Sequence, residues 1–220
     1  MKNSSRSFFR AAFLFALAFA AWTAAVCRID VQPIGPDTSS VGFAAINRFF
    51  HDLTGTHLTL YVLTDWLSLI PLSLAVGFGI TGLAQWIRRK KLWRVDFDLL
   101  ALGGFYLAVL AAYALFEVFP VNFRPITLNG VLEPSYPSST TVLVLCVMGS
   151  AILQFRLRIR SLLCRRFAVW TSAIFAAGMV LGRLIAGVHW FTDIAGGILL
   201  SASLLALYVG VCRCERNIHP

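Results

Sequence analysis

The chain has 220 residues, of which 58% are hydrophobic and only 13% are charged, and its mean hydropathy is +0.77. These proportions exclude an ordinary soluble globular protein, in which about 25% of the residues are charged. The formal net charge of +9 leaves open a nucleic-acid partner, so the positions of the basic residues must decide between that class and a membrane protein.

Six stretches are long and apolar enough to cross a hydrocarbon layer of about 30 Å, and the fourth is the shortest. Unpaired backbone groups are costly in lipid, so these continuous runs predict helices, whereas a membrane barrel would show short alternating segments. The sequence therefore predicts an all-α polytopic membrane protein with one six-helix transmembrane domain over residues 1–220. The stretches lie at about 8–27, 58–86, 97–119, 138–155, 167–187 and 190–212.

The first apolar stretch follows a basic start and ends in AWTAAVC, a pattern that a cleavable signal peptide also has. Val26 directly before Cys27 fits neither small-residue cleavage rule, and the apolar run is long for a signal peptide. We therefore expect an uncleaved membrane anchor.

The next connection contains turn-forming residues in QPIGPDTSS, followed by a helical pattern in VGFAAINRFFHDL. Ser39 or Ser40 is expected to cap this short helix. Its apolar positions near one face are Val41, Ala45, Phe49 and Leu53. We expect this face to pack against the bundle, and the alternatives are a helix in the outer interface or one that closes over a cavity.

The basic residues are distributed unevenly among the connections. Fifteen of the 19 Lys and Arg residues precede the first stretch, follow the last, or lie in the second and fourth connections. The other four are Arg28, Arg48, Arg124 and Arg183. This positive-inside pattern predicts six spans with both termini in the cytoplasm. The net charge then reflects orientation and contact with anionic headgroups, and no nucleic-acid partner is expected.

The predicted topology gathers a set of polar residues at the outer membrane face. Ionisable residues at such positions are usually functional, although each alone could be an interfacial polar group or an arginine that reaches the headgroups. Asp65 is expected to cap a helix or form an ion pair near this face. The gathered residues are Glu117, Arg124, Ser138, Ser139, Thr140, Arg183, His189 and Asp193.

Spacing refines the prediction. On one helix, His189 and Asp193 would share a face, so the carboxylate could hold the second imidazole nitrogen. Arg183 would point elsewhere on an unbroken helix, but Gly187 allows a turn that brings two antiparallel helices to one pocket. A histidine oriented by an aspartate, beside two guanidiniums, suits nucleophilic attack on phosphorus. The inferred chemistry is phosphoryl transfer through a phosphohistidine.

These residues also carry a resemblance to a known family. The segment Gly182-Arg183, followed by His189 and Asp193, is similar to the third motif of the type 2 phosphatidic acid phosphatase family, Ser-Arg-x5-His-x3-Asp. Membrane members of that family are six-span enzymes related to vanadium haloperoxidases, and they need no metal. The resemblance covers about residues 110–200 and points to a divergent bacterial branch.

The first two motifs of the family are altered. Arg124-Pro125 matches the end of the first motif, Lys-x6-Arg-Pro, but Glu117 occupies the lysine position. The second motif, Pro-Ser-Gly-His, is matched by Pro137 and Ser138 only, because Ser139 and Thr140 stand where glycine and histidine are expected. The family histidine that protonates the leaving alcohol is therefore missing, and Glu117 is left either to tether Arg124 or to contact substrate.

The resemblance implies a role for each matching residue. His189 would be the nucleophile and Asp193 its partner, while Arg124 and Arg183 would clamp the phosphate. Ser138 would contribute a hydrogen bond to it. Ser139 and Thr140 depart from the motif, and we expect them to bind the phosphate as well. No cofactor is expected, because the family needs none and no group of ligand residues has metal-site spacing.

The predicted function is a membrane lipid phosphatase at the outer face of a bacterial cell membrane. Because a lipid alkoxide needs a general acid to leave and a phosphate does not, a lipid diphosphate is the expected preference. Tyr136, Glu133 and His57 are candidate substitute acids. The alternative is a catalytically inactive relative that binds or translocates lipid phosphates. A small transporter is less favoured because no inverted repeat is visible, and the oligomeric state stays open.

Overall fold

The structure is a computed structural model that describes residues 2–128 and 130–218. These residues form helices joined by connections that contain only isolated β-bridges. The elements are α1 (Lys2–Val26), η1 (Pro36–Thr38), α2 (Ala44–Thr54), α3 (Leu58–Leu67), α4 (Leu69–Arg89), η2 (Leu92–Arg94), α5 (Phe97–Val118), α6 (Ser139–Arg158), α7 (Leu162–Ile185) and α8 (Phe191–Ile218).

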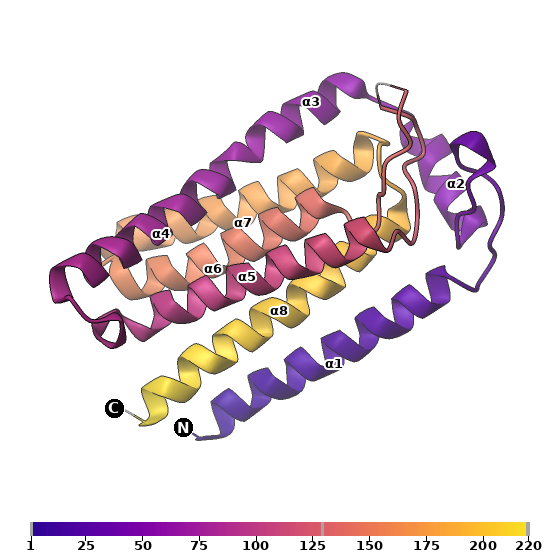
Figure 1. The fold of residues 1–220 in the computed structure, drawn as a ribbon. Coiled ribbons are helices and arrows are strands. Elements are labelled where there is room, and N and C mark those ends of the chain that lie inside the picture. Colours follow the sequence, from indigo (N-terminus) through magenta and orange to yellow (C-terminus); the bar gives the residue numbers. More distant parts are fainter. Residues whose placement is uncertain (1, 129, 219–220) are drawn as a thin grey trace.

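The prediction of six membrane-spanning segments is confirmed for the described residues. Six helical segments have the length and hydropathy to cross a bilayer, and α3 with α4 together make the second of them. The shortest of the six spans is α6, with 20 residues. At 1.5 Å per residue its length is about the 30 Å of a hydrocarbon core. The long helices run roughly side by side (Figure 1). Because the number of spans is even, the N- and C-terminal ends lie together at one end of the bundle. We call this the terminal end, and the opposite end the loop end.

Helix α6 is the centre of the bundle. In its most apolar window 56% of the residues are buried, against 6–33% for the other spans. Leu102, Phe105 and Val109 of α5 belong to one buried cluster with Val142 and Cys146 of α6. Because lipid tails are as apolar as these side chains, close packing of this kind stabilises the bundle more than the hydrophobic effect does.

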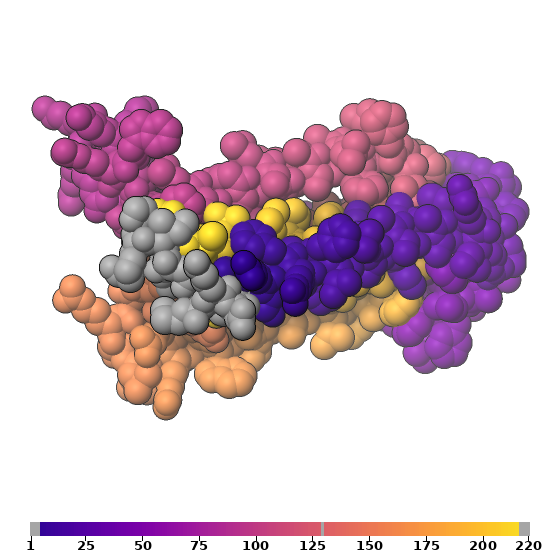
Figure 2. All heavy atoms as spheres, turned by 90° about the horizontal axis from the view of Figure 1, so that it is seen from below, coloured from indigo at the N-terminus to yellow at the C-terminus, as the bar shows by residue number. Residues whose placement is uncertain are grey.

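Helix α1 lies along the outside of the bundle, against α8 (Figure 2). Two hydrogen bonds tie the pair together, from Ser203 Oγ to the Ala12 carbonyl at 2.9 Å and from Trp22 Nε1 to the Thr192 carbonyl at 3.2 Å. Near the terminal end, Gly210 of α8 comes into close contact with the ring of Phe9, which a small residue permits.

The second span is interrupted at Ser68. Its N–H and its hydroxyl both donate to the Asp65 carbonyl, which closes the last turn of α3. Pro71 follows and has no N–H for the Leu67 carbonyl, so the helical hydrogen-bond ladder breaks there. Helix α3, which precedes this break, carries Tyr61, Thr64 and Asp65 near the loop end.

The short helix α2 lies at the loop end and differs from two expectations. Neither predicted serine caps it, since the helix begins only after Phe43, in a left-handed conformation (φ 49°). Instead, Asp30 accepts a hydrogen bond from the Ala45 N–H through its carboxylate, at 2.7 Å, and one from the Ala44 N–H through its carbonyl. Just before the helix, Gly42 lies so close to the Val26 carbonyl oxygen that an added Cβ would come within 1.7 Å of it.

The face of α2 that packs on the protein is also not the one predicted. Phe49 and Leu53 are 62% and 69% exposed, and the buried residues of the helix are Ala44 and Asn47. Asn47 makes the firm contact, because its amide binds both the hydroxyl and the backbone N–H of Thr192 at the start of α8. The apolar face therefore points away from the bundle, as in a helix that lies in a membrane interface.

A polar network joins three spans at the terminal end. Arg158 of α6 lies 2.6 Å from Asp98 and 3.2 Å from Asp96, and Arg89 lies 2.9 Å from Asp96. Gln85 adds two hydrogen bonds to Asp96, through its amide N–H2 and its amide oxygen. Burial alone would raise the pKa of Asp96, but the hydrogen bonds from Gln85, Arg89 and Arg158 outweigh it and hold the pKa below its usual value.

Candidate active site

The loop end holds a buried group of charged side chains from two connections and two helices. His189 and Asp193 are 4% and 0% exposed, and Arg124 and Arg183 are 8% and 1% exposed. Burying an arginine without a full set of partners is costly. Two buried arginines in one place therefore indicate a site for an anionic ligand.

His189 is positioned by a sharp turn after α7. Gly187 has φ +67°, a conformation that favours glycine, and a Cβ there would come within 1.9 Å of the Gly55 carbonyl oxygen. The backbone N–H of His57 donates to the Ala186 carbonyl at 2.9 Å, so the α2–α3 connection holds this turn in place. The turn predicted at Gly187 is thus present.

His189 precedes α8 and does not lie on it, which corrects the expected arrangement on one helix. Helix α8 begins at Phe191, and the Asp193 carboxylate accepts the N–H of Trp190 at 3.0 Å, as a cap of the first turn. The same carboxylate oxygen lies 3.8 Å from His189 Nδ1. The two residues are neighbours as predicted, but through the helix cap and not through helical periodicity.

Arg124 contacts the other side of the imidazole. Its Nη1 lies 3.3 Å from His189 Nε2 and 3.5 Å from the Val188 carbonyl oxygen. Its Nε lies 2.9 Å from a carboxylate oxygen of Glu133, although the Nε–H does not point at that oxygen. Glu133 faces it across the connection between α5 and α6, where the Arg124 N–H donates to the Glu133 carbonyl. Glu133, and not Glu117, is therefore the partner of Arg124.

Arg183 reaches the site from the end of α7. Its guanidinium lies 4.9 Å from the centre of the Tyr61 ring, and that of Arg124 lies 5.9 Å from the same ring. Arg183 Nη1 donates to Thr64 Oγ1 at 3.3 Å and lies 3.8 Å from Asp65. The expected ion pair of Asp65 is present, and both guanidiniums lie within cation–π distance of the Tyr61 ring.

The electrostatics of the site keep the histidine neutral. Burial lowers the pKa of His189 to about 4, and the charges of Arg124 and Arg183 act in the same direction. Asp193 opposes this shift without reversing it. At neutral pH the imidazole therefore carries a free lone pair, which a nucleophile needs.

Two buried asparagines connect the site to its surroundings. Asn122 Nδ2 donates to Asp193 Oδ1 at 3.1 Å and lies 3.4 Å from the Thr192 hydroxyl, which Asn47 also binds. These contacts fix the Asp193 carboxylate from the side opposite His189. Sequence reasoning missed Tyr61, Thr64, Asn47 and Asn122, and their only signal was a polar side chain beside an apolar run.

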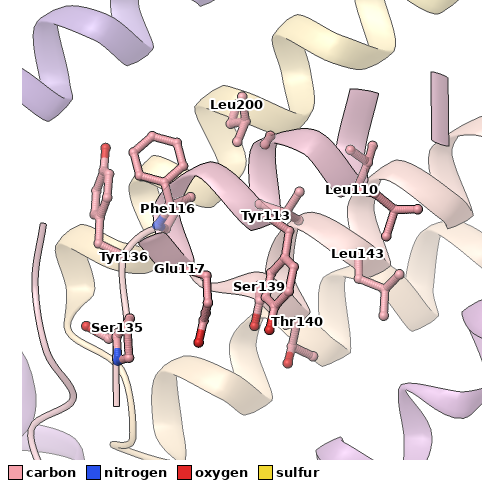
Figure 3. A pocket seen from close by; sticks show the side chains of 15 residues that line it. Leu110, Tyr113, Phe116, Glu117, Ser135, Tyr136, Ser139, Thr140, Leu143 and Leu200 are labelled. Atoms are coloured by element: carbon pink, nitrogen blue, oxygen red, sulfur yellow. The ribbon is translucent and has the colours of Figure 1, made fainter. Parts of the chain in front are cut away.

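The three residues expected to bind phosphate through hydroxyl groups lie in two different places in the structure. Ser138 is fully buried, and its N–H donates to the Asp193 carbonyl at 3.1 Å while its hydroxyl accepts from Thr141. Ser139 and Thr140 instead line a cavity between α5 and α6, together with Glu117 (Figure 3). Among the described residues, neither makes a hydrogen bond to an arginine or to His189.

The remaining predicted residues take structural positions. The Tyr136 hydroxyl lies 2.6 Å from Thr23 Oγ1 of α1, and burial raises the pKa of Tyr136. The His57 ring is bonded to the Thr54 carbonyl at 2.8 Å. In the part of the chain that the structure describes, no three His, Cys, Asp or Glu side chains are grouped as metal ligands would be.

Comparisons with known proteins agree with this architecture. Residues 118–213 match the family model described as the PAP2 superfamily. A crystal structure of the first transmembrane PAP2 type phosphatidylglycerolphosphate phosphatase from Bacillus subtilis is similar, with a TM-score of 0.59 and 17% sequence identity. The similarity covers 94% of this chain and 96% of that one. No curated protein sequence gives a significant match. The family match is confined to residues 118–213, which include Arg124, Arg183, His189 and Asp193, and the fold is shared along nearly the whole chain.

Proposed function

We propose that this protein is a membrane lipid phosphatase in which His189 is the nucleophile. Family and fold support a membrane phosphatase in general terms. The observation that carries the specific proposal is the position of the imidazole between a guanidinium, 3.3 Å from Nε2, and a carboxylate, 3.8 Å from Nδ1. That order of groups suits attack on an anionic phosphorus centre.

The contacts of the ring indicate which nitrogen reacts. A guanidinium only donates hydrogen bonds, so the Nε2 that faces Arg124 is the unprotonated nitrogen. The proton then resides on Nδ1, on the side of Asp193. In this tautomer the lone pair of His189 points to the place where Arg124 would hold a phosphate.

The proposed reaction has two steps. Nε2 of His189 attacks phosphorus, a P–N bond forms, and the bond from phosphorus to the leaving oxygen breaks with its electron pair on that oxygen. Asp193 stabilises the cationic ring, while Arg124 and Arg183 neutralise the phosphoryl oxygens. Water then attacks phosphorus, a P–O bond forms, and the P–N bond breaks with its electron pair on Nε2. The phosphate leaves with the protons of that water, and the neutral imidazole is regenerated. The buried Ser138, beside Asp193, completes the group that we assign to this reaction.

The leaving group decides the substrate class. An alkoxide needs a proton as it leaves, and Thr140 cannot supply one near neutral pH, whereas a phosphate leaves a diphosphate as a stable anion. The substitute acids are all engaged, since Tyr136 is bonded to Thr23, His57 to Thr54, and Glu133 pairs with Arg124. We therefore propose a preference for a lipid diphosphate, such as a prenyl diphosphate.

The test uses the full-length protein in lipid nanodiscs, with phosphate release measured from undecaprenyl diphosphate and from phosphatidic acid. We expect faster release from the diphosphate, and His189→Asn should reduce it to background. His51→Asn is the matched control, because His51 contacts Trp190 but lies on α2, outside the reacting group. Equal rates on the two lipids would contradict the preference, and full activity of His189→Asn would contradict the nucleophile.

A second candidate is an inactive relative that binds lipid phosphates, the alternative raised by the altered motifs. The observation in its favour is the Glu133 carboxylate on Arg124, which competes with a phosphate for that guanidinium. Trapping with a ³²P-labelled lipid diphosphate separates the two functions. A labelled protein that is absent in His189→Asn supports the enzyme, whereas saturable lipid binding without any labelling supports the inactive relative.

We further propose that both termini are cytoplasmic and that the site faces the outside of a bacterial cell membrane. Two cysteines provide a test, because Cys27 is exposed at the loop end and Cys164 is exposed at the terminal end. A membrane-impermeant maleimide on intact cells should label Cys27 and spare Cys164 until the cells are permeabilised. Labelling that persists in Cys27→Ser on intact cells would contradict this orientation.

A further inference from the structure

The cavity between α5 and α6, which we call the α5–α6 cavity, shares no lining residue with the charged group Arg124, Arg183, His189 and Asp193. Its volume is about 270 Å³, and it is lined by both helices, by the segment before α6, and by Leu200 of α8. Its lining contains the Glu117 carboxylate but no arginine, lysine or histidine. Its chemistry is therefore the opposite of the site proposed for phosphate.

The polar and apolar walls of the cavity are arranged along the helix axes. Figure 3 shows the oxygen atoms of Glu117, Tyr113, Ser139 and Thr140 on the same side of the cavity. Glu117 lies at the loop end of α5, and Leu110 lies about two helical turns deeper in the span. An amphiphile would therefore fit with its head at the loop end and its chain along the helices.

A buried polar group in the cavity lacks a partner. Ser135 is 3% exposed and lines the cavity, and its hydroxyl makes no hydrogen bond in the described structure. Most buried side-chain hydroxyls are hydrogen-bonded, so an unpaired one in a cavity wall indicates a place for a ligand group that donates or accepts.

Glu117 restricts the chemistry of that ligand. Within the described residues its carboxylate takes part in no salt bridge, so an anionic headgroup would meet an uncompensated negative charge. A hydroxyl group can donate to the carboxylate and can also exchange hydrogen bonds with Ser135, Ser139 and Thr140. A quaternary ammonium has neither N–H nor O–H, so it can make no hydrogen bond to any of these oxygens.

We propose that the α5–α6 cavity binds the neutral, hydroxyl-bearing head of a membrane amphiphile, such as the glycerol of a monoacylglycerol, with its chain on Leu110 and Leu143. This binding site does not depend on catalysis by His189. Ser139 and Thr140 then contact hydroxyl groups of a lipid and not the phosphate expected from the sequence.

The test measures equilibrium binding of three probes with the same ten-carbon chain, monodecanoylglycerol, decyl phosphate and decyltrimethylammonium. The protein is the full chain in phosphatidylcholine nanodiscs free of sugar-headed detergent, with His189→Asn present to prevent turnover. We expect saturable binding of monodecanoylglycerol at least roughly ten-fold tighter than that of the other two probes. Tighter binding of the phosphate or of the ammonium would overturn the proposal.

Variants locate the binding. Glu117→Lys should weaken monodecanoylglycerol binding roughly ten-fold and strengthen that of decyl phosphate. Leu110→Trp should abolish binding by filling the cavity, and since Leu110 is 61% exposed, the larger side chain does not disturb the core. Asp52→Asn on α2 is the control, because it removes an exposed carboxylate at the same end of the molecule. Unchanged binding in both cavity variants would refute the site, whatever the phosphatase assay shows.

Discussion

The two ends of the bundle differ in how completely their charged side chains are paired. At the terminal end, Arg158 lies within 3.2 Å of two carboxylates, and Asp96 receives hydrogen bonds from Gln85 and Arg89 as well. At the loop end, the Nε atoms of Arg124 and Arg183 and the Nδ1 of His189 are buried without a hydrogen bond in the described structure. At the terminal end the charged groups find their partners within the protein. At the loop end several hydrogen-bond donors have no partner in the described structure.

The difference separates a structural network from a site prepared for a ligand. Unpaired buried donors cost stability, so a fold retains them where a ligand supplies the missing partner. The carboxylates near the arginines do not remove the excess, because Asp65 and Glu133 have side chains that are 58% and 40% exposed. Changes at the loop end should therefore alter catalysis, and changes at the terminal end should alter stability.

Apart from the loss of His189 itself, the largest effect is expected from Arg124→Lys. A lysine keeps the positive charge but loses the planar pair of donors that can hold two phosphoryl oxygens. We expect kcat/KM for the lipid diphosphate to fall roughly 10²–10³-fold, with little change in the thermal unfolding temperature. The measurement is phosphate release together with a thermal melt of the same sample. A loss of stability without a loss of rate would reverse the proposed roles of the two ends.

The next effect is expected from Gly187→Ala. The new Cβ would collide with the Gly55 carbonyl oxygen and would force a φ of +67° on an alanine, at a cost of at least about 1–2 kcal/mol. Displacing His189 by about 1 Å should lower kcat roughly 10²-fold. Gly178→Ala in α7 is the matched control, since nothing lies within 4 Å of its added Cβ. Equal behaviour of the two variants would show that the turn does not position the histidine.

A smaller effect, on stability alone, is expected from Arg158→Met. The variant leaves Asp96 and Asp98 without their shared partner, but these side chains are 21–32% exposed, so solvent screens part of the loss. We expect the free energy of unfolding to fall by about 1–2 kcal/mol, with kcat/KM unchanged. Thermal melts and phosphate release on one preparation check both parts. A drop in kcat/KM at full stability would show that the terminal end also serves catalysis.

The smallest effect is expected from mild acid. Because the pKa of His189 is lowered to about 4, the imidazole stays neutral as the pH falls through the ordinary histidine value of 6.5. The protonation of His189 should therefore not reduce kcat/KM between pH 7.5 and 5.5. In the unfolded chain the same imidazole takes up a proton below pH 6.5, so its contribution to stability falls as the pH drops from 6.5 towards 4. A fall in kcat/KM centred near pH 6.5 would contradict the buried, neutral histidine.

Much of the fold could be predicted from the sequence because a bilayer imposes a simple rule. Backbone groups in lipid must be satisfied within one segment, so length and hydropathy alone identify the six spans. The alternation of spans then places Arg124, Arg183 and His189 at the same end of the molecule. The local chemistry of Gly187 is also readable, because few residues other than glycine reverse the chain so sharply.

The expectations that failed depend on contacts between segments far apart in the sequence. Asp30, 15 residues away, caps α2 in place of the nearby serines. The apolar face of α2 was expected on the bundle, but Asn47 binds Thr192 and turns that face outward. Hydrophobic periodicity gives the faces of a helix, and it does not say which neighbour each face will meet.

The sequence by itself determined an all-α membrane bundle, the end at which its ionisable residues gather, and the neighbouring pair His189 and Asp193. Only the tertiary structure decided that Glu133 and not Glu117 lies on Arg124, and that Ser139 and Thr140 line a cavity with Glu117. The physical reason is that hydropathy fixes how deep a residue lies, because transfer into lipid depends on one segment at a time. Hydropathy does not fix which side chains meet at that depth. Those contacts depend on the rotation of each helix about its axis and on the path of the long connections, and both are set by the packing of the whole bundle.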